Sequence, residues 1–338
     1  MAIKVGISGF GRIGRVVIRV MADHPDIDLV GINYRNADLD YLVYMLKYDS
    51  AFGRFNGTVE KYDEGLIING KKVRVFSQDQ IIDIPWEECG AEYVIESTGA
   101  YTTTEKAMDH IKAGAKKVII SAPAKDKETP MFVYGVNHDV YTKDMQIISN
   151  ASCTTNCLAP VCKVIEDNFG IEQGLMATIH ASTSKQKSVD MRSMKDWRVG
   201  RSVYDNIIPT TTGAAKAVGK VIPSLEGKMT GLSYRIPAPT GSLVDLNVIT
   251  KKPTSYEEIC KVMKEAAEGE LKGVLMYSED ELVSVDVVAQ PITSVFDSKM
   301  GIEMGDRFFK VVSFYDNEYG YSNQILNMIE HMYKVDHE

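Results

Sequence analysis

The chain has 338 residues, which predicts two domains at about 100–200 residues per domain. Apolar residues make up 44% and charged residues 25%, a globular composition that excludes disorder for the bulk of the chain. The net charge of −8, with no offsetting basic run, argues against general nucleic-acid binding. With no apolar run of membrane-spanning length and no signal-peptide pattern, we expect no membrane association and a cytoplasmic location.

The five cysteines are an odd number, which argues against a disulfide framework. Their spacing does not match a structural zinc site, so no metal is expected. At least one of them is therefore a candidate for a reactive thiol. They are Cys89, Cys153, Cys157, Cys162 and Cys260.

The first half alternates apolar runs with helical spacing, which predicts crossover units and a mostly parallel sheet. The expected elements are strands at 3–8, 27–32, 93–97 and 118–121, with helices at 12–21 and 103–113. Asn69-Gly70 is a strong turn signal and predicts a hairpin within residues 65–75.

The second half changes character, because its later apolar runs alternate and predict an antiparallel sheet with helices on one face. The expected elements are helices at 154–168, 255–268 and 322–333, and strands at 242–248, 282–288 and 308–314. The polar stretch 182–204 lacks clear periodicity, and loops of that length are often functional or packed against a partner.

A GxGxxG motif, Gly9-Phe10-Gly11-Arg12-Ile13-Gly14, follows the first strand and opens the first helix. This is the context in which the motif binds a dinucleotide. Gly9 permits the tight turn, Gly11 lets the backbone approach the pyrophosphate, and Gly14 allows close helix–strand packing. The alternative is a chance glycine-rich loop.

The second strand ends without the acidic residue that usually binds the adenosine ribose hydroxyls. The segment reads Asn33-Tyr34-Arg35-Asn36, and the next acid is Asp38. An acid would repel a 2′-phosphate, whereas Arg35 suits one by charge and geometry. The alternative is that Arg35 is a solvated surface residue and Tyr34 merely covers adenine.

A second polar motif, Ser149 to Cys157, lies between a strand and a helix. A cysteine at a helix N-terminus, such as Cys153, is favoured as a thiolate, and the neighbouring hydroxyls can bind an anion. His180 ends another strand-like run and is the candidate to pair with Cys153 and handle its proton. Cys157, one helical turn on, is expected to be buried.

Four blocks in the right order resemble phosphorylating glyceraldehyde-3-phosphate dehydrogenase, over essentially the whole length. They are residues 9–15, 149–158, 206–223 (NIIPTTTGAAKAVGKVIP) and 315–323 (YDNEYGYSN). The resemblance implies an α/β protein with an N-terminal Rossmann domain at 1–150 and an α+β catalytic domain with an antiparallel sheet at 151–316, including loop 182–204. A C-terminal helix at 317–338 returns to the Rossmann domain.

The resemblance also implies a covalent mechanism through a cysteine thioester, with Cys153 as the nucleophile and His180 as the base. The expected substrates are glyceraldehyde 3-phosphate and inorganic phosphate, with NAD or NADP as cofactor in a cytoplasmic homotetramer of glycolysis or gluconeogenesis. Further cofactor-binding positions are Arg12, Ile13, Thr98, Gly99, Ser121, Asn317 and Tyr321. Thr183 and Arg235 match residues that hold the C3 phosphate, and Ser152, Thr154, Thr212 and Gly213 match those that receive the attacking phosphate.

Several positions depart from the family pattern. Ser8 stands where Asn is usual, Tyr34 where Asp is usual, and Lys185 where Asp or Thr is common. Arg192 stands where NAD-specific enzymes often have Pro, in a loop that reaches the neighbouring subunit's adenosine pocket. Arg35 and Arg192 would then converge on one ribose, so we predict that NADP is accepted; the alternative is an NAD enzyme in which Arg192 pairs with Asp38 or a similar acid.

Three other functions compete with this one. An erythrose-4-phosphate dehydrogenase is disfavoured by the retained Thr183, Thr212 and Gly213. A non-catalytic binding protein on the same scaffold is disfavoured by the set Cys153, His180 and Asn317. A semialdehyde dehydrogenase would not be expected to carry the 206–223 block.

Overall fold

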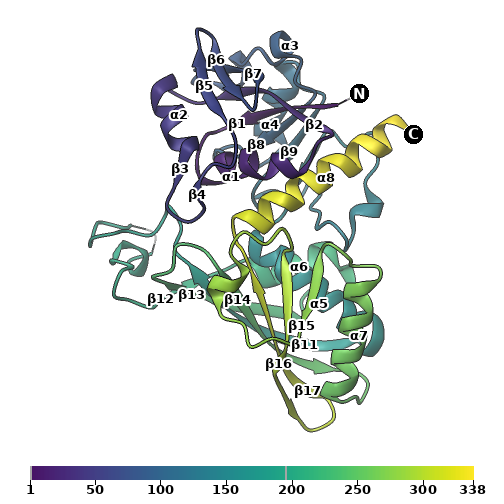
Figure 1. Cartoon of the computed structure of the whole chain (residues 1–338). Coiled ribbons are helices and arrows are strands. Elements are labelled where there is room, and N and C mark those ends of the chain that lie inside the picture. The colour runs from purple at the N-terminus through teal and green to yellow at the C-terminus, as the bar shows by residue number, and fades with distance from the viewer. Residues whose placement is uncertain (1, 195) are drawn as a thin grey trace. The chain divides into compact units, whose positions relative to one another are not determined.

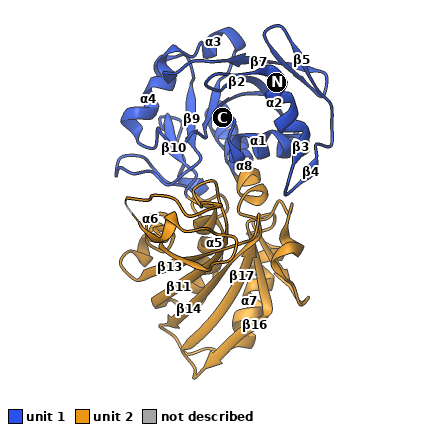
Figure 2. Ribbon diagram, turned by 90° about the vertical axis from the view of Figure 1, so that its left-hand side faces the viewer, with its two compact units in different colours: residues 1–132, 138–151, 325–338 blue, residues 133–137, 152–324 orange. Residues whose placement is uncertain are grey.

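The computed structural model describes residues 2–194 and 196–338. Met1, at the start of the first predicted domain, and Lys195, within the predicted loop 182–204, lie outside the described residues. The chain forms two compact units (Figure 2). The first contains the residues up to 132 together with 138–151 and 325–338, and the second contains 133–137 and 152–324. The predicted domain limits at residues 150 and 316 remain predictions.

The first unit contains an eight-stranded sheet in the order β10-β9-β8-β1-β2-β7-β6-β5. The neighbours from β10 through β7 are parallel, and the hairpin strands β7, β6 and β5 are antiparallel. The predicted mostly parallel sheet is thus confirmed. The strands are β1 (Ile3–Ser8), β2 (Ile27–Asn33), β5 (Val59–Tyr62), β6 (Gly65–Ile68), β7 (Lys71–Phe76), β8 (Tyr93–Glu96), β9 (Lys117–Ile120) and β10 (Ile147–Ser149).

Local sequence signals explain several boundaries of the first unit (Figure 1). Thr103 caps helix α4 (Thr104–Lys112) by accepting from the Lys106 amide, as Ser and Thr do at helix starts. The predicted hairpin is confirmed, since Asn69 and Gly70 both have positive φ, as a tight two-residue turn requires. The other helices are α1 (Arg12–Val20), α2 (Leu39–Lys47), α3 (Trp86–Cys89) and the later part of α8 (Tyr319–His337).

The second unit contains a seven-stranded sheet in the order β12-β13-β11-β14-β17-β16-β15. The pairs β11–β13 and β15–β16 are parallel and the other pairs are antiparallel. The sheet is therefore mixed and mainly antiparallel, which refines the prediction. Its strands are β11 (Ile171–Ala181), β12 (Ile208–Thr211), β13 (Met229–Ile236), β14 (Ser242–Thr250), β15 (Leu275–Ser278), β16 (Ser294–Met304) and β17 (Phe308–Tyr315).

Three helices pack on elements of this sheet, namely α5 (Cys153–Phe169), α6 (Ala214–Val221) and α7 (Tyr256–Glu268). Gly170 ends α5 with φ 70°, a conformation that favours glycine. Ser255 caps α7 by accepting from the Glu258 amide. No helix within the described part of the chain is long and apolar enough to cross a membrane.

One predicted strand is wrong. Residues 282–288 contain a short 3-10 helix, Ser284–Val287, instead of a strand. The Asp286 carboxylate accepts from the Val283 amide at 2.7 Å, which stabilises a turn in place of a strand ladder. Val287 is buried against Val295 and Val312, so one valine of the apolar pattern does serve the core.

Candidate functional site

The glycine motif forms the turn between β1 and α1. Gly9 has φ 102°, and its amide donates to the Asn33 carbonyl at 2.9 Å. A Cβ on Gly14 would lie 2.2 Å from the Gly9 oxygen, whereas a Cβ on Gly11 would meet no atom within 4 Å. Gly9 and Gly14 are thus required by the local backbone, and Gly11 leaves an open backbone surface of the kind a pyrophosphate needs.

A cavity of about 330 Å³ lies beside this turn. Its lining combines the glycine turn with the ends of β2 and β8, and five predicted cofactor residues are among the lining residues. They are Gly9, Gly11, Tyr34, Arg35 and Thr98. The other candidates of this unit, Arg12, Ile13, Gly14, Gly99 and Ser121, do not line it; the Arg12 guanidinium is paired with Asp49, and the Ser121 hydroxyl donates to the Glu96 carbonyl.

The end of β2 carries an acidic neighbour that sequence reasoning missed. The Arg35 Nη2 donates to the Asp79 carbonyl at 3.0 Å, and its Nε lies 3.6 Å from the Asp79 carboxylate. Both side chains are exposed. Asp79 is 44 residues further along the chain, so only the pairing of β2 with β7 brings it to this position.

A series of buried hydrogen bonds between side chains fixes the position of Thr98. The Trp86 Nε1 donates to His110 Nδ1 at 3.1 Å, and His110 Nε2 donates to Glu96 at 3.0 Å. The other Glu96 oxygen accepts from the Thr98 amide at 2.8 Å and from its hydroxyl. Glu96 and His110 are almost fully buried, so these hydrogen bonds hold the end of β8 at the edge of the cavity.

Glu96→Gln is expected to destabilise the protein by about 1–3 kcal/mol, because glutamine has one acceptor oxygen and leaves a buried donor unpaired. Urea unfolding would measure the loss. Glu105→Gln, on the exposed face of α4, is the matched control and should stay within about 0.5 kcal/mol of the parent protein. If Glu96→Gln and the parent unfolded at the same urea concentration, the stabilising role of the Glu96 hydrogen bonds would be contradicted.

In the second unit, Cys153 is the first residue of α5 and lies beside a histidine. The Cys153 Sγ is 3.4 Å from His180 Nε2, at the end of β11. Ser152 caps the helix by accepting from the Thr155 amide at 3.0 Å. Burial raises the pKa of the Cys153 thiol, and the positive charge of Arg235 opposes that shift.

The His180 imidazole is held on its other nitrogen by Arg235, whose Nη1 lies 2.7 Å from His180 Nδ1. The Ala181 carbonyl oxygen also lies 2.7 Å from Nδ1; the guanidinium can only donate and the carbonyl can only accept, so the two contacts on Nδ1 require opposite tautomers of the ring. Burial, followed by the charge of Arg235, lowers the pKa of His180 to about 3. The raised pKa of the Cys153 thiol and the lowered pKa of His180 both favour the neutral thiol and imidazole. The N-terminus of α5 favours the thiolate, and the thiolate–imidazolium pair stays a prediction.

Two residues near the Cys153–His180 pair, Tyr315 and Thr178, were not assigned a role from the sequence. The Tyr315 hydroxyl lies 2.9 Å from both the Thr154 and the Thr178 hydroxyls, and all three are buried. Burial raises the pKa of Tyr315 well above its usual value. Cys157 is buried as predicted, and burial raises its pKa to about 12, which makes it a poor nucleophile.

The phosphate candidates lie at separate places in the second unit. Arg235 reaches His180 from β13, while Thr183 is bonded through its amide and hydroxyl to the Gln186 side chain at 2.9 Å. Thr212 and Gly213 precede the first turn of α6, where the Thr212 hydroxyl accepts from the Ala214 amide at 3.2 Å. Lys185 is exposed beside Thr183.

The last cofactor candidates also lie in the second unit. Asn317 follows β17, and its Oδ1 accepts from the Ser242 hydroxyl at 2.8 Å. Tyr321 is 3% exposed in the first turn of α8. Arg192 is exposed, and its Nε donates to the Met194 sulfur at 3.1 Å. Asp38, proposed as an alternative partner, instead caps α2 through the amides of Asp40 and Tyr41.

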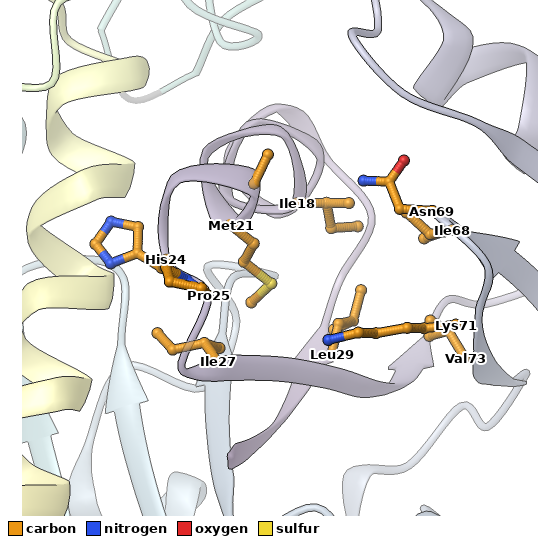
Figure 3. Close-up of a pocket in the computed structure, with 11 residues that line it drawn as sticks. Ile18, Met21, His24, Pro25, Ile27, Leu29, Ile68, Asn69, Lys71 and Val73 are labelled. Atoms are coloured by element: carbon orange, nitrogen blue, oxygen red, sulfur yellow. The ribbon is translucent and has the colours of Figure 1, made fainter.

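A further cavity, of about 190 Å³, lies elsewhere in the first unit (Figure 3). Its walls are mostly apolar, and two of its cationic side chains already have acidic partners. Lys71 pairs with Asp28, and the His24 Nδ1 lies 2.8 Å from Glu330. The cavity has none of the predicted site residues and lacks the glycine turn, so it is not the dinucleotide site.

Comparison with known proteins covers nearly the whole chain. Residues 3–104 match the family described as glyceraldehyde 3-phosphate dehydrogenase, NAD binding domain, and residues 152–317 match its C-terminal domain. Glyceraldehyde-3-phosphate dehydrogenase 2 of Mucor circinelloides f. lusitanicus is 55% identical over 336 residues, or 99% of each chain. The glyceraldehyde-3-phosphate dehydrogenase of Escherichia fergusonii is 57% identical over 334 residues, 99% of this chain and 100% of the relative. Glyceraldehyde-3-phosphate dehydrogenase A of Escherichia coli K12 is 56% identical with the same coverage. With this similarity added to the Cys153–His180 pair and the glycine turn, the chain is an enzyme of the glyceraldehyde-3-phosphate dehydrogenase family.

Proposed function

We propose that this chain oxidises and phosphorylates D-glyceraldehyde 3-phosphate to 1,3-bisphosphoglycerate through a covalent thioester on Cys153. The observation that carries the proposal is the 3.4 Å contact between the Cys153 sulfur and His180 Nε2 at the start of α5. A thiol beside a base, at a helix N-terminus, is suited to attack a carbonyl and to stabilise the oxyanion that forms.

The reaction divides into two halves at Cys153. The thiolate attacks the aldehyde carbon, forming a carbon–sulfur bond while the carbonyl oxygen takes up negative charge. The Cys153 amide and the Nε2–H of His180, protonated by the Cys153 thiol, are the donors for that oxygen. The imidazolium passes its proton to the oxygen, and the neutral imidazole takes that proton back as the hydride leaves. Loss of hydride from the former aldehyde carbon leaves a thioester, which inorganic phosphate cleaves to give an acyl phosphate and the free thiolate.

A bound nicotinamide dinucleotide supplies the acceptor for the hydride. The residues present fit such a molecule: Gly11 leaves its backbone open, and a cavity of about 330 Å³ adjoins the turn. We assign to this group Gly9, Gly11, Arg12, Ile13, Gly14, Tyr34, Arg35, Thr98, Gly99 and Ser121 of the first unit, and Asn317 and Tyr321 of the second.

The two phosphates require different binding. For the C3 phosphate, which stays with the substrate, we assign Arg235 and Thr183, since a guanidinium retains a phosphate strongly. For the attacking phosphate, which must bind and leave, we assign the hydroxyls and amides of Ser152, Thr154, Thr212 and Gly213. Arg235 would release His180 Nδ1 as it turns to the phosphate, which removes the contact that lowers the basicity of the imidazole.

NADP use is the finer part of the proposal. Arg35 lines the cavity and has no acidic residue next to it in the sequence, which supports a 2′-phosphate. The carboxylate of Asp79, 3.6 Å from the Arg35 Nε, opposes it. We therefore propose that NADP is accepted, with Arg192 of a neighbouring subunit as a second contact in a homotetramer.

Arg35→Ala is expected to lower kcat/KM for NADP about tenfold, the loss of one charge-assisted hydrogen bond at an exposed site, while changing that for NAD less than about threefold. Asp79→Asn is the complementary variant and should raise kcat/KM for NADP, since it removes a negative charge beside the phosphate. Initial rates with both cofactors measure this. An equal fall for both cofactors with Arg35→Ala would contradict the 2′-phosphate contact.

The proposed function is tested by initial rates with glyceraldehyde 3-phosphate, inorganic phosphate and either cofactor, and with erythrose 4-phosphate as the comparison aldehyde. We expect phosphate-dependent reduction of the cofactor with the triose as the better substrate. The absence of a rate with either cofactor would overturn the proposal. The free state of all five cysteines supports a cytoplasmic location, in glycolysis or gluconeogenesis.

A further inference from the structure

We propose that Ser242 is a positioning residue for the nicotinamide ring, because it fixes which end of the Asn317 amide is offered to the cofactor. The proposal rests on the proposed function, in which Asn317 binds the nicotinamide carboxamide. The new element is that this contact depends on Ser242. Ser242 also connects Asn317 to the strand that carries His180.

The sheet topology places Ser242 between the two strand ends that matter. Strand β14 lies between β11 and β17 and runs antiparallel to both, so its first residue is level with their last residues. Ser242 is the first residue of β14 and pairs with Tyr315. His180 and Ala181 end the strand on the other side.

The Ser242 hydroxyl links these two ends by hydrogen bonds. The Ala181 amide donates to Ser242 Oγ at 3.0 Å, and Ser242 Oγ donates to Asn317 Oδ1 at 2.8 Å. Ser242 is 1% exposed, so water does not compete for its hydroxyl. One donated and one accepted bond satisfy the serine and leave it a single arrangement.

The neighbouring Thr240 does not replace Ser242 in this role. Its hydroxyl lies 3.4 Å from Asn317 Oδ1 but only 2.8 Å from the Asp316 carboxylate. A hydroxyl has one hydrogen, and the charged acceptor at the shorter distance takes it. The orientation of the Asn317 amide therefore depends on Ser242.

The Asn317 backbone is held independently by its neighbour. The Asp316 carboxylate accepts from the amides of Glu318 and Ala289, both at 2.8 Å. With the backbone fixed, rotation of the amide by half a turn is the main freedom left to Asn317. Because Ser242 donates to Oδ1, Nδ2 is turned the other way, and within the described residues it has no protein acceptor.

An amide Nδ2 can only donate, so it selects a carbonyl oxygen. The nicotinamide carboxamide provides one, and its attachment fixes which face of the ring is presented to the hydride donor. Without Ser242, the contact left to Asn317 Oδ1 is the 3.4 Å one with the Thr240 hydroxyl, whose hydrogen goes to Asp316, so the amide is oriented more weakly. The carboxamide would then be held more weakly and the ring would be free to turn over.

Ser242→Ala is expected to raise the Kd for NAD about three- to tenfold, as measured by isothermal titration calorimetry without substrate. The same variant should transfer a measurable fraction of hydride to the opposite face of the ring, which deuterated glyceraldehyde 3-phosphate followed by NMR of the reduced cofactor would detect. Ser242→Thr keeps the hydroxyl and should restore face selectivity.

Ser233→Ala is the matched control, because Ser233 is a buried serine of strand β13 whose hydroxyl has no hydrogen-bond partner. It should leave the NAD affinity and the face selectivity unchanged. Equal weakening by both serine variants would overturn the proposal, as would an unchanged Kd and unchanged face selectivity in Ser242→Ala. If Asn317→Ala also had no effect, the carboxamide role within the proposed function would fail instead.

Discussion

Replacing Cys153 with serine is expected to lower kcat about 10⁴-fold or more, while NAD affinity changes little. A serine hydroxyl does not ionise near neutral pH, so the nucleophile is lost together with the thioester on which the second half of the reaction depends. The side chain belongs to the second unit, whereas the glycine turn and its cavity belong to the first, so dinucleotide binding should survive.

The matched control is Cys260→Ser, a half-buried cysteine of α7 whose sulfur donates to the Ser298 carbonyl at 3.9 Å. It should keep the parent rate. Phosphate-dependent initial rates measure both variants, and calorimetry gives the NAD affinity. If Cys153→Ser kept a tenth of the parent rate, the covalent mechanism would be wrong.

His180→Asn is expected to lower kcat about 10²–10⁴-fold, the usual contribution of a general acid or base. The same change should slow alkylation of Cys153 by iodoacetamide at neutral pH. Without the imidazole, the thiolate forms only by ionisation of a thiol whose pKa burial has raised. The pH–rate profile of alkylation should therefore move to higher pH, and the two proteins should become equal only in strong base.

The exposed imidazole of His337, in the last turn of α8, gives a control in His337→Asn, which should leave both the rate and the profile unchanged. Superimposable alkylation profiles for His180→Asn and the parent would mean that the 3.4 Å contact has no influence on the thiol. A lowered kcat with an unchanged profile would restrict His180 to the steps after thiol attack.

Arg235 makes a contact that its assignment by resemblance did not include. Its matched role is to hold the C3 phosphate, yet its Nη1 lies 2.7 Å from His180 Nδ1. Burial and then the positive charge of this guanidinium lower the pKa of His180. The guanidinium has five N–H donors, so its contact with His180 leaves further donors for a phosphate.

The amino-acid sequence by itself determined the features that depend on local chemistry. The glycine spacing of residues 9–14 predicted a turn that the backbone confirms, with φ 102° at Gly9 and no room for a side chain at Gly14. The placement of Cys153 at a helix N-terminus and the tight hairpin turn at Asn69-Gly70 were both predicted and are confirmed. In each case the residues that decide the conformation are neighbours along the chain.

The tertiary structure alone decided which distant residues meet. Asp79 reaches Arg35 because β7 pairs with β2, and Ser242 reaches Asn317 because β14 lies beside β17. The same reason explains the error at 282–288, where an alternating apolar run forms a 3-10 turn instead of a strand. Strand order and register are set by contacts between segments far apart in sequence, and a local pattern does not specify its partner.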